Sequence, residues 1–306
     1  MITQSMIIEL RVKTGAGIMN CRDTLMETNG DLEKAITILK EKGMTIAAKK
    51  VERVTAEGLV SGHISKDHKA GAIIELNCET DFVAINEEFV KLADNLAKQA
   101  VTTTTHIVPD FTAEKYLAGE NITIQDALTS LVAKLRENIT LRRFVSYRTE
   151  NGYILNYIHG GRIGVLLEMA PGRDNSALAG IGKEIAMQIA ATNPLFIGRE
   201  DINPELLVNE TEAYRKQAID DGKPETIADK IATGKIAKYI KEKCLLEQVW
   251  IKNEDMTIAD YLQNMSGKLG GEIKIIRFTR FEKGEGLVKR EDNLAQAVRE
   301  QIYGNK

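Results

Sequence analysis

The chain has 306 residues, of which 43 % are hydrophobic and 5 % aromatic, a composition typical of two or three small globular domains rather than one large core. Its formal net charge of −3 and its isoelectric point near 6.0 argue against nucleic acid or an anionic membrane as the default partner. No apolar stretch is long enough to span a membrane, and residues 1–5 lack the features of a signal or transit peptide, so we expect a cytoplasmic protein.

Residues 3–42 are predicted to form three short helices. Paired glycines after Thr14 end the first helix, the second runs from about Ile18 to Thr28, and Asp31 caps the third. A bundle of about forty residues has a marginal core, and such a module is usually a docking unit. We therefore expect an N-terminal docking bundle that resembles the ubiquitin-associated type.

Residues 43–55 are charged and lack a sustained apolar stripe, so we interpret them as a linker. The first predicted domain, a three-helix bundle with its linker, thus comprises residues 1–54. Within the linker, Lys49 and Lys50 are interpreted as a solvated face, with contact to an acidic partner as the alternative.

From residue 56 onward the chain repeats itself. Residues 69–76 match 162–169, the helices that follow align from Leu92 with Ile181, and residues 123–144 match 257–278. Each copy is predicted to contain a hairpin, a helix, a second helix and a third strand. We therefore expect an α+β fold with helices packed on small antiparallel sheets, divided into core repeat 1 over 55–150 and core repeat 2 over 151–288.

The two copies differ in length at two places. The first copy carries four extra residues between its apolar strand and its helix, in the loop around Thr80, Asp81, Phe82 and Val83. A structural interpretation of this loop is a hydrophobic staple, with Phe82 or Val83 packed against the next helix and Asn86 as its cap. Because the second copy folds without the extension, we favour a surface for another protein.

The second copy carries a long insertion at about 200–247, which is predicted to form an antiparallel coiled-coil hairpin. Leu207, Thr211, Tyr214 and Ala218 would form its inner face on the outgoing helix, and Ile227, Ile231 and Gly234 would begin the returning face. A dimer contact, a contact with another protein and a spacer all remain open as its role. Residues 289–306 are predicted to form a C-terminal helical module.

No metal, cofactor or nucleophilic site is predicted from the cysteines and histidines. The cysteines Cys21, Cys78 and Cys244 lie far apart in the sequence, and each is interpreted as a small buried hydrophobic residue. None of the four histidines lies at a spacing typical of a metal pair or of a nucleophile and its base. We therefore expect no cofactor and no catalytic residues.

Taken together, the motifs of the chain resemble the bacterial elongation factor Ts family along nearly its whole length. The residues that carry the resemblance are Thr14-Gly15-Ala16-Gly17 with Met19, Cys21 and Asn29-Gly30-Asp31; Asn77-Cys78-Glu79-Thr80-Asp81-Phe82-Val83-Ala84; His159-Gly160 with Arg162-Ile163-Gly164-Val165; Gly222-Lys223-Pro224; and Cys244-Leu245-Leu246-Glu247-Gln248. The second of these motifs is highly specific.

The resemblance implies a guanine nucleotide exchange factor for the GTPase elongation factor Tu, without nucleotide binding or enzymatic activity of its own. It implies that Asp81 and Phe82, flanked by Thr80 and Val83, act as a wedge near the magnesium and phosphate site of the GTPase. GDP would then be released, and GTP would later displace the factor.

Weaker partner contacts are implied at Arg22, Lys49, Lys50, Leu135, His159 and Arg162. Two departures from the family pattern bear on them. Arg22-Asp23 stands where relatives commonly have two lysines, and Arg136 stands where some relatives have a glycine. The alternative functions are an adaptor that binds RNA or a ubiquitin-like protein and an enzyme that uses carboxylates near Asp81. The first lacks a basic and aromatic platform.

Overall fold

The computed structural model of the chain describes residues 2–14, 16–48, 50, 53–170 and 177–287. These residues fall into two units. The first unit contains the described residues within 1–61, 74–145 and 281–306, and the second contains those within 62–73 and 146–280. Lys49 and the helix expected at 289–306 lie outside the described residues, and the domain boundaries expected from the sequence stay a prediction.

The N-terminal region forms three helices, as predicted. They are α1 (Gln4–Thr14), α2 (Ile18–Glu27) and α3 (Leu32–Ala48). Their shared core consists of Leu10, Cys21, Leu25, Ala35 and Leu39. Gly30, at φ 84°, lies between α2 and α3, and the Asp31 carboxylate accepts a hydrogen bond from the Lys34 N–H at 3.1 Å. The likeness of this bundle to the ubiquitin-associated type remains a prediction.

Helix α3 extends through the first part of the expected linker, so the linker interpretation is wrong for residues 43–48. Gly43 is buried, and a Cβ added there would lie 3.3 Å from Cβ of Ala133 in α7 (Ile124–Leu135). The missing side chain thus lets the two helices approach closely. The extension of α3 is accompanied by packing against α7. Residues 43–55 have no sustained apolar stripe, so this packing could not be predicted from them.

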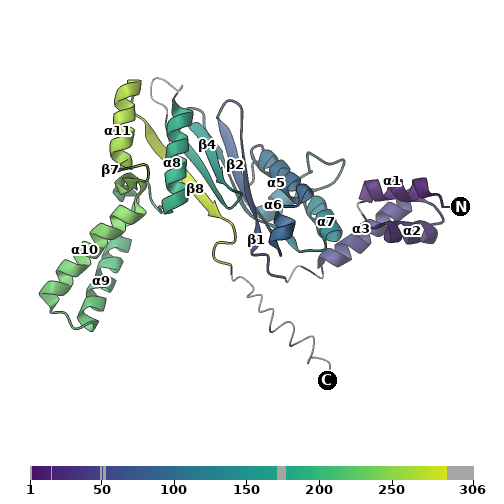
Figure 1. Ribbon diagram of the computed structural model, residues 1–306, viewed down its shortest axis with the longest axis horizontal. Helices are drawn as coiled ribbons and strands as arrows, with labels where there is room; N and C mark the ends of the chain where they lie inside the picture. Colours follow the sequence, from purple (N-terminus) through teal and green to yellow (C-terminus); the bar gives the residue numbers. More distant parts are fainter. Residues whose placement is uncertain (1, 15, 49, 51–52, 171–176, 288–306) are drawn as a thin grey trace. The chain divides into compact units, whose positions relative to one another are not determined.

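The first core repeat pairs an antiparallel sheet with a layer of helices (Figure 1). The sheet order is β1-β2-β3, with β1 (Glu57–Ile64), β2 (Ala70–Cys78) and β3 (Ile139–Arg148). The helices are α4 (Asp81–Ala84), α5 (Glu87–Ala100), α6 (Val108–Ala113) and α7. The buried face of α5 includes Phe89, Leu92 and Leu96, as its periodicity predicts.

The second core repeat has the same sheet order, β4-β5-β8. Its strands are β4 (Tyr153–His159), β5 (Ile163–Ala170) and β8 (Lys274–Glu282), and its helices are α8 (Leu178–Thr192) and α11 (Ile258–Leu269). Short elements η1 (Arg199–Asp201), η2 (Leu245–Glu247), β6 (Val249–Trp250) and β7 (Asn253–Thr257) complete it. The α+β fold class is thereby confirmed.

Equivalent hydrogen bonds occur at corresponding positions of the two repeats. The Gln99 side chain donates to the Lys115 carbonyl at 2.9 Å and accepts from the Leu117 N–H at 3.0 Å. Its counterpart Gln188 makes the same pair of bonds, at 3.1 and 2.9 Å, to the backbone of Val249 and Ile251. Capping boxes begin α7 and α11 in the same way.

The insertion forms two helices, α9 (Pro204–Asp220) and α10 (Glu225–Lys243), that contact each other. Ala218 of α9 is buried, as predicted, but the predicted start of the returning face is wrong, because Ile227 is 46 % exposed and Ala228 and Ala232 are buried instead. Small side chains allow closer approach of the two helices than isoleucines do. A coiled-coil packing remains a prediction.

One residue at the end of α7 stores backbone strain. Arg136 has φ 59°, whereas its counterpart in the second repeat is Gly270, at φ 67°. The left-handed conformation costs a residue with a Cβ about 1 kcal/mol, and glycine adopts it freely.

We expect Arg136→Gly to raise the free energy of unfolding by about 0.5–1 kcal/mol, because it relieves this strain. Gly270→Ala is the matched control and is expected to lower it by about 1 kcal/mol, since no atom lies within 4 Å of the added Cβ and only the backbone conformation opposes it. Urea unfolding measures both. A destabilised Arg136→Gly variant would contradict the assignment of strain.

Candidate functional site

The loop between β2 and α5 contains one helical turn, α4, and Thr80 anchors its start. The Glu137 carboxylate accepts hydrogen bonds from the Thr80 N–H at 3.0 Å and from the Thr80 hydroxyl at 2.6 Å. The same hydroxyl accepts a bond from the Val83 N–H at 3.4 Å and so caps α4. Charge-assisted bonds of this kind are stronger than neutral ones, so Glu137 holds the turn in place.

The residues before the turn are tied down in the same manner. The Glu79 carboxylate accepts from the Asn138 N–H at 2.7 Å and pairs with Arg53 at 3.1 Å. The Cys78 thiol donates to the Thr80 carbonyl at 3.1 Å, and the Asn77 side-chain amide donates to the Thr55 carbonyl at 3.0 Å. The loop is therefore a fixed platform built from neighbouring parts of the first unit.

On this platform Phe82 points away from its own fold. Its side chain is 78 % exposed, so the hydrophobic staple is wrong for Phe82, whereas Val83 is half-buried. The predicted cap of α5 is confirmed, because the Asn86 side-chain oxygen Oδ1 accepts a hydrogen bond from the Glu88 N–H at 3.0 Å. Phe82 takes no part in this cap. An exposed fraction of 78 % is unusual for so large an apolar side chain.

Ile85 is a second exposed apolar residue that we did not predict as part of this site. It is 79 % exposed and lies three residues after Phe82, a spacing that brings side chains together on one helical face. The spacing is visible in the sequence, but the sequence predicts a loop rather than a helical turn at this place. Phe82 and Ile85 together form an apolar ridge, the name used below for these two side chains.

Asp81 lies beside the apolar ridge, in the first turn of α4. It is exposed, and its carboxylate has no hydrogen bond or ion pair with another residue of the described ranges. The turn thus presents one free carboxylate and two apolar side chains. Exposed apolar side chains of this kind are typical of a protein–protein contact surface.

The other predicted contacts in the first unit differ in their accessibility. Arg22 is exposed and pairs with Asp23 at 3.1 Å. Lys50 is not on a solvated face, because its side chain is only 14 % exposed and its ammonium group donates to the Arg136 carbonyl. Leu135 is half-buried at the end of α7. These positions stay predictions as partner contacts.

His159 and Arg162 belong to the second unit, so the structure does not place them relative to the apolar ridge. They flank a turn in which Gly160 and Gly161 have φ of 55° and 68°, and the Arg162 N–H donates to the His159 carbonyl at 2.9 Å. Both side chains are exposed, and the His159 ring bonds the Tyr157 hydroxyl at 3.0 Å. The turn exposes His159 and Arg162, as a binding loop would.

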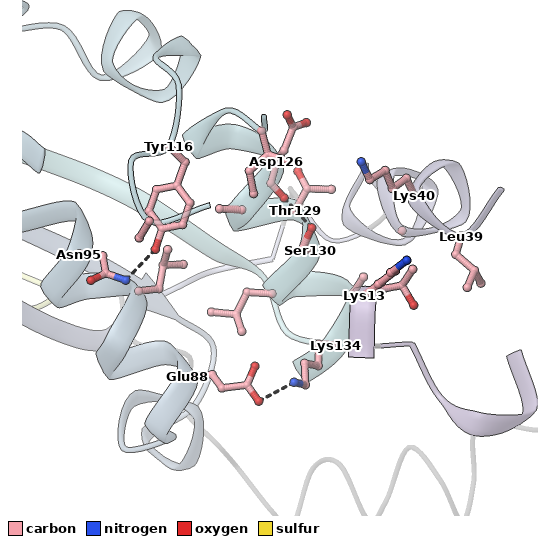
Figure 2. A pocket seen from close by; sticks show the side chains of 18 of the residues that line it. Lys13, Leu39, Lys40, Glu88, Asn95, Tyr116, Asp126, Thr129, Ser130 and Lys134 are labelled. Carbon is pink, nitrogen blue, oxygen red and sulfur yellow. Dashed lines mark hydrogen bonds and ion pairs between the residues drawn. The ribbon is translucent and has the colours of Figure 1, made fainter. Parts of the chain in front are cut away.

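A cavity of about 610 Å³ lies within the first unit, between the three-helix bundle and the first repeat (Figure 2). Lys13 and Lys40 border it on the bundle side, and Glu88 and Lys134, paired at 2.5 Å, border it on the repeat side. No residue from Thr80 to Val83 lines it.

Among the described residues there is no group of acidic, histidine or cysteine side chains arranged to hold a metal ion, and no helix that could cross a membrane.

Cys78 lies directly beneath the turn and is fully buried, as are Cys21 and Cys244, in agreement with the prediction. Burial, and then the nearby carboxylates of Glu137 and Glu57, raise the pKa of the Cys78 thiol to about 12. A thiol with so high a pKa is protonated at neutral pH and is not a nucleophile. Cys78 therefore serves as a packed hydrogen-bond donor.

Comparison with known proteins points to a single family. A family model described as "Elongation factor TS" matches residues 79–285. A protein of Clostridium botulinum (strain ATCC 19397 / Type A) named "Elongation factor Ts" is 49 % identical over 307 residues, covering 100 % of both chains. Proteins of the same name from Clostridium novyi (strain NT) and Clostridium botulinum (strain Alaska E43 / Type E3) are 48 % and 50 % identical over 303 residues, with 99 % of each chain covered.

The raised pKa of Cys78 predicts slow alkylation in the native protein. At pH 8 a thiol with a pKa near 12 is about 10⁻⁴ ionised, so iodoacetamide should modify Cys78 at least about 10³-fold more slowly than a free thiol. Peptide mass spectrometry after timed quenching measures this rate. Protein unfolded in urea is the control and should react at the ordinary rate; a native rate within tenfold of that control would refute the assignment.

Proposed function

The chain belongs to the elongation factor Ts family, and we propose that it is a cytoplasmic guanine nucleotide exchange factor that releases GDP from elongation factor Tu during translation elongation. The observation that carries this proposal is the exposure of Phe82, 78 %, on a turn that Glu137 holds in place. In this proposal the chain acts as a binding protein on a GTPase, performs no covalent chemistry and binds neither nucleotide nor nucleic acid itself.

In the proposed mechanism, Asp81 and Phe82 enter the GTPase beside its phosphate site and displace the loops that hold Mg²⁺. The magnesium ion neutralises the phosphates of GDP, so its loss removes the largest stabilising charge at that site. The rigid platform beneath the turn supports this role, because a side chain that is already fixed loses little conformational entropy when it is inserted.

The energy required exceeds what Phe82 supplies alone. Burying a phenyl side chain contributes about 1.5–3 kcal/mol, whereas loosening GDP about 10⁴-fold requires roughly 5.5 kcal/mol of differential binding. Ile85 belongs to the same apolar ridge and would add a contribution of similar size. At the lower end of this range the two side chains fall short of roughly 5.5 kcal/mol, and a wider interface supplies the difference.

The three-helix bundle is the first candidate for that wider interface. Its helix α2 exposes Ile18, Met19 and Met26, which are 54 %, 56 % and 60 % exposed, on a helix that also carries Arg22. Apolar side chains gathered on one small module support a docking role. We assign Arg22, Lys49, Lys50 and Leu135 to the GTPase contact, with Lys50 acting through its support of the Arg136 backbone.

The second unit is proposed to contact another part of the same partner through the turn that carries His159 and Arg162. Self-association through α9 and α10 is one of the three roles left open for the insertion, and the exposed Val208 and Ile227, 56 % and 46 %, are side chains on which it would rest. Coupling in the complex is reciprocal, so GTP that binds the GTPase tightly also weakens its hold on the factor.

Phe82→Ala is expected to slow GDP release from elongation factor Tu by about 10- to 100-fold at equal factor concentration, because it removes the larger side chain of the apolar ridge. Stopped-flow fluorescence of a labelled GDP measures the rate. The free energy of unfolding should change by less than about 0.5 kcal/mol, since the exposed ring contributes little to the fold.

Leu117→Ala is the matched control, because Leu117 is 69 % exposed in the same unit but lies outside the turn. It should leave the release rate unchanged. Ile85→Ala should give a decrease smaller than that of Phe82→Ala. Equal rates for Phe82→Ala and the unsubstituted protein would exclude the wedge mechanism while leaving exchange activity itself established.

A further inference from the structure

Helix α3 connects the three-helix bundle to the first repeat and takes part in both. Its first half contributes Ala35 and Leu39 to the core of the bundle. Its second half packs on α7, and Gly43 is buried at that contact. The helix is continuous over 17 residues, which corresponds to a length of about 25 Å. One regular element thus joins two parts of the first unit.

The contact between α3 and α7 requires a residue without a side chain at position 43. A Cβ added to Gly43 would lie 3.3 Å from Cβ of Ala133, which is closer than most Cβ contacts in proteins. Two other helical glycines, Gly234 in α10 and Gly267 in α11, have no atom within 4 Å of an added Cβ. Glycine is a poor helix former, so its place inside α3 is explained by close packing rather than by helix formation.

Two cations that follow α3 are bound at the end of α7. The Lys50 ammonium group donates to the Arg136 carbonyl. Arg53 pairs at 3.1 Å with Glu79, whose carboxylate also accepts from the Asn138 N–H at 2.7 Å. Lys50 and Arg53 are therefore fixed beside the platform that carries the apolar ridge. The contact at Gly43 and these bonds hold the same side of the repeat.

The charged groups that border the cavity pair within one side of it. Lys13 pairs with Glu9 at 2.9 Å inside the bundle. On the repeat side Lys134 pairs with Glu88 at 2.5 Å (Figure 2). These ion pairs therefore do not hold the bundle against the repeat. The packing of α3 on α7 is the contact that sets the position of the bundle.

We propose that Gly43 is a positioning residue, which lets α7 approach and so makes α3 a fixed arm between the bundle and the apolar ridge. The bundle and the apolar ridge would then meet the partner as one preformed surface. This inference rests on the proposed exchange function and extends it, because it gives the bundle a fixed place before the partner binds. Two contact sites held in a fixed arrangement lose less freedom on binding than two sites joined by a loose linker.

A disulfide between α3 and α7 tests the fixed arm without a measurement of activity. Gly43→Cys with Ala133→Cys brings two Cβ atoms to 3.3 Å, just below the range of about 3.5–4.5 Å in natural disulfides, and the native cysteines are buried. Gly43→Cys with Gln125→Cys is the matched control, because Gln125 is exposed and lies about 12 Å farther along α7. With diamide as oxidant, we expect the first pair to form its disulfide at least about 100-fold faster. Comparable rates would refute a fixed arm.

GDP release then measures whether the fixed arm matters for exchange. Locking α3 by the disulfide should change the factor concentration for half-maximal release by less than about twofold, since the arm already lies there. Gly43→Leu should raise that concentration about fivefold or more, because leucine displaces α3 from α7, and should leave the rate at saturation unchanged, because the apolar ridge is intact. Gly267→Leu is the matched control and should change neither value. Equal circular dichroism of the two leucine variants verifies that the bundle is folded in both.

A larger change in the locked chain would refute the proposal, because the bundle would then have to move on the repeat during exchange. An unchanged half-maximal concentration for Gly43→Leu would refute the positioning role. Failure of the exchange function would appear differently, as a lack of GDP release by the unsubstituted protein. In that case the two rates of disulfide formation would still decide whether α3 is fixed on α7.

Discussion

The two hydrogen bonds between Glu137 and Thr80 are the interaction on which the proposed exchange activity depends. Burial of a phenyl ring within its own protein is favourable. Phe82 nevertheless remains exposed, because hydrogen bonds of Glu137, Glu79 and Asn77 fix the backbone beneath it. The stability of the first unit comes from cores that do not include the ring. Phe82 is thus free to contribute its burial to a complex rather than to the fold.

Comparison of the two repeats distinguishes the interactions that the shared fold requires from those that only one repeat has. Both repeats keep the glutamine that bonds two backbone groups, the capped second helix, and a buried glutamate paired with an arginine, Glu75 with Arg143 and Glu168 with Arg277. Only the first repeat has Arg142 bound to its buried glutamate, and only the second has the helical insertion. Symmetry-related positions share one packing task, so the departures mark where selection acted on something else.

Most of the fold could be predicted from local patterns, and the errors came from contacts between distant residues. The periodicity of α5 and the cap at Asn86 are local and were correct. The extension of α3 depends on Gly43 meeting Ala133, and the burial of Ala228 in place of Ile227 depends on the approach of α9 and α10. Ile85 was missed at the candidate site because the helical turn that pairs it with Phe82 depends on Glu137, far along the chain.

The central claim is that the apolar ridge binds the nucleotide-free GTPase better than its GDP complex. Titration calorimetry of the chain with each form of elongation factor Tu measures this difference directly. The account predicts that the ratio of the two affinities is large, and that Phe82→Ala lowers it by about 10- to 100-fold, mostly through weaker binding to the nucleotide-free form. A ratio that Phe82→Ala leaves unchanged would contradict the account.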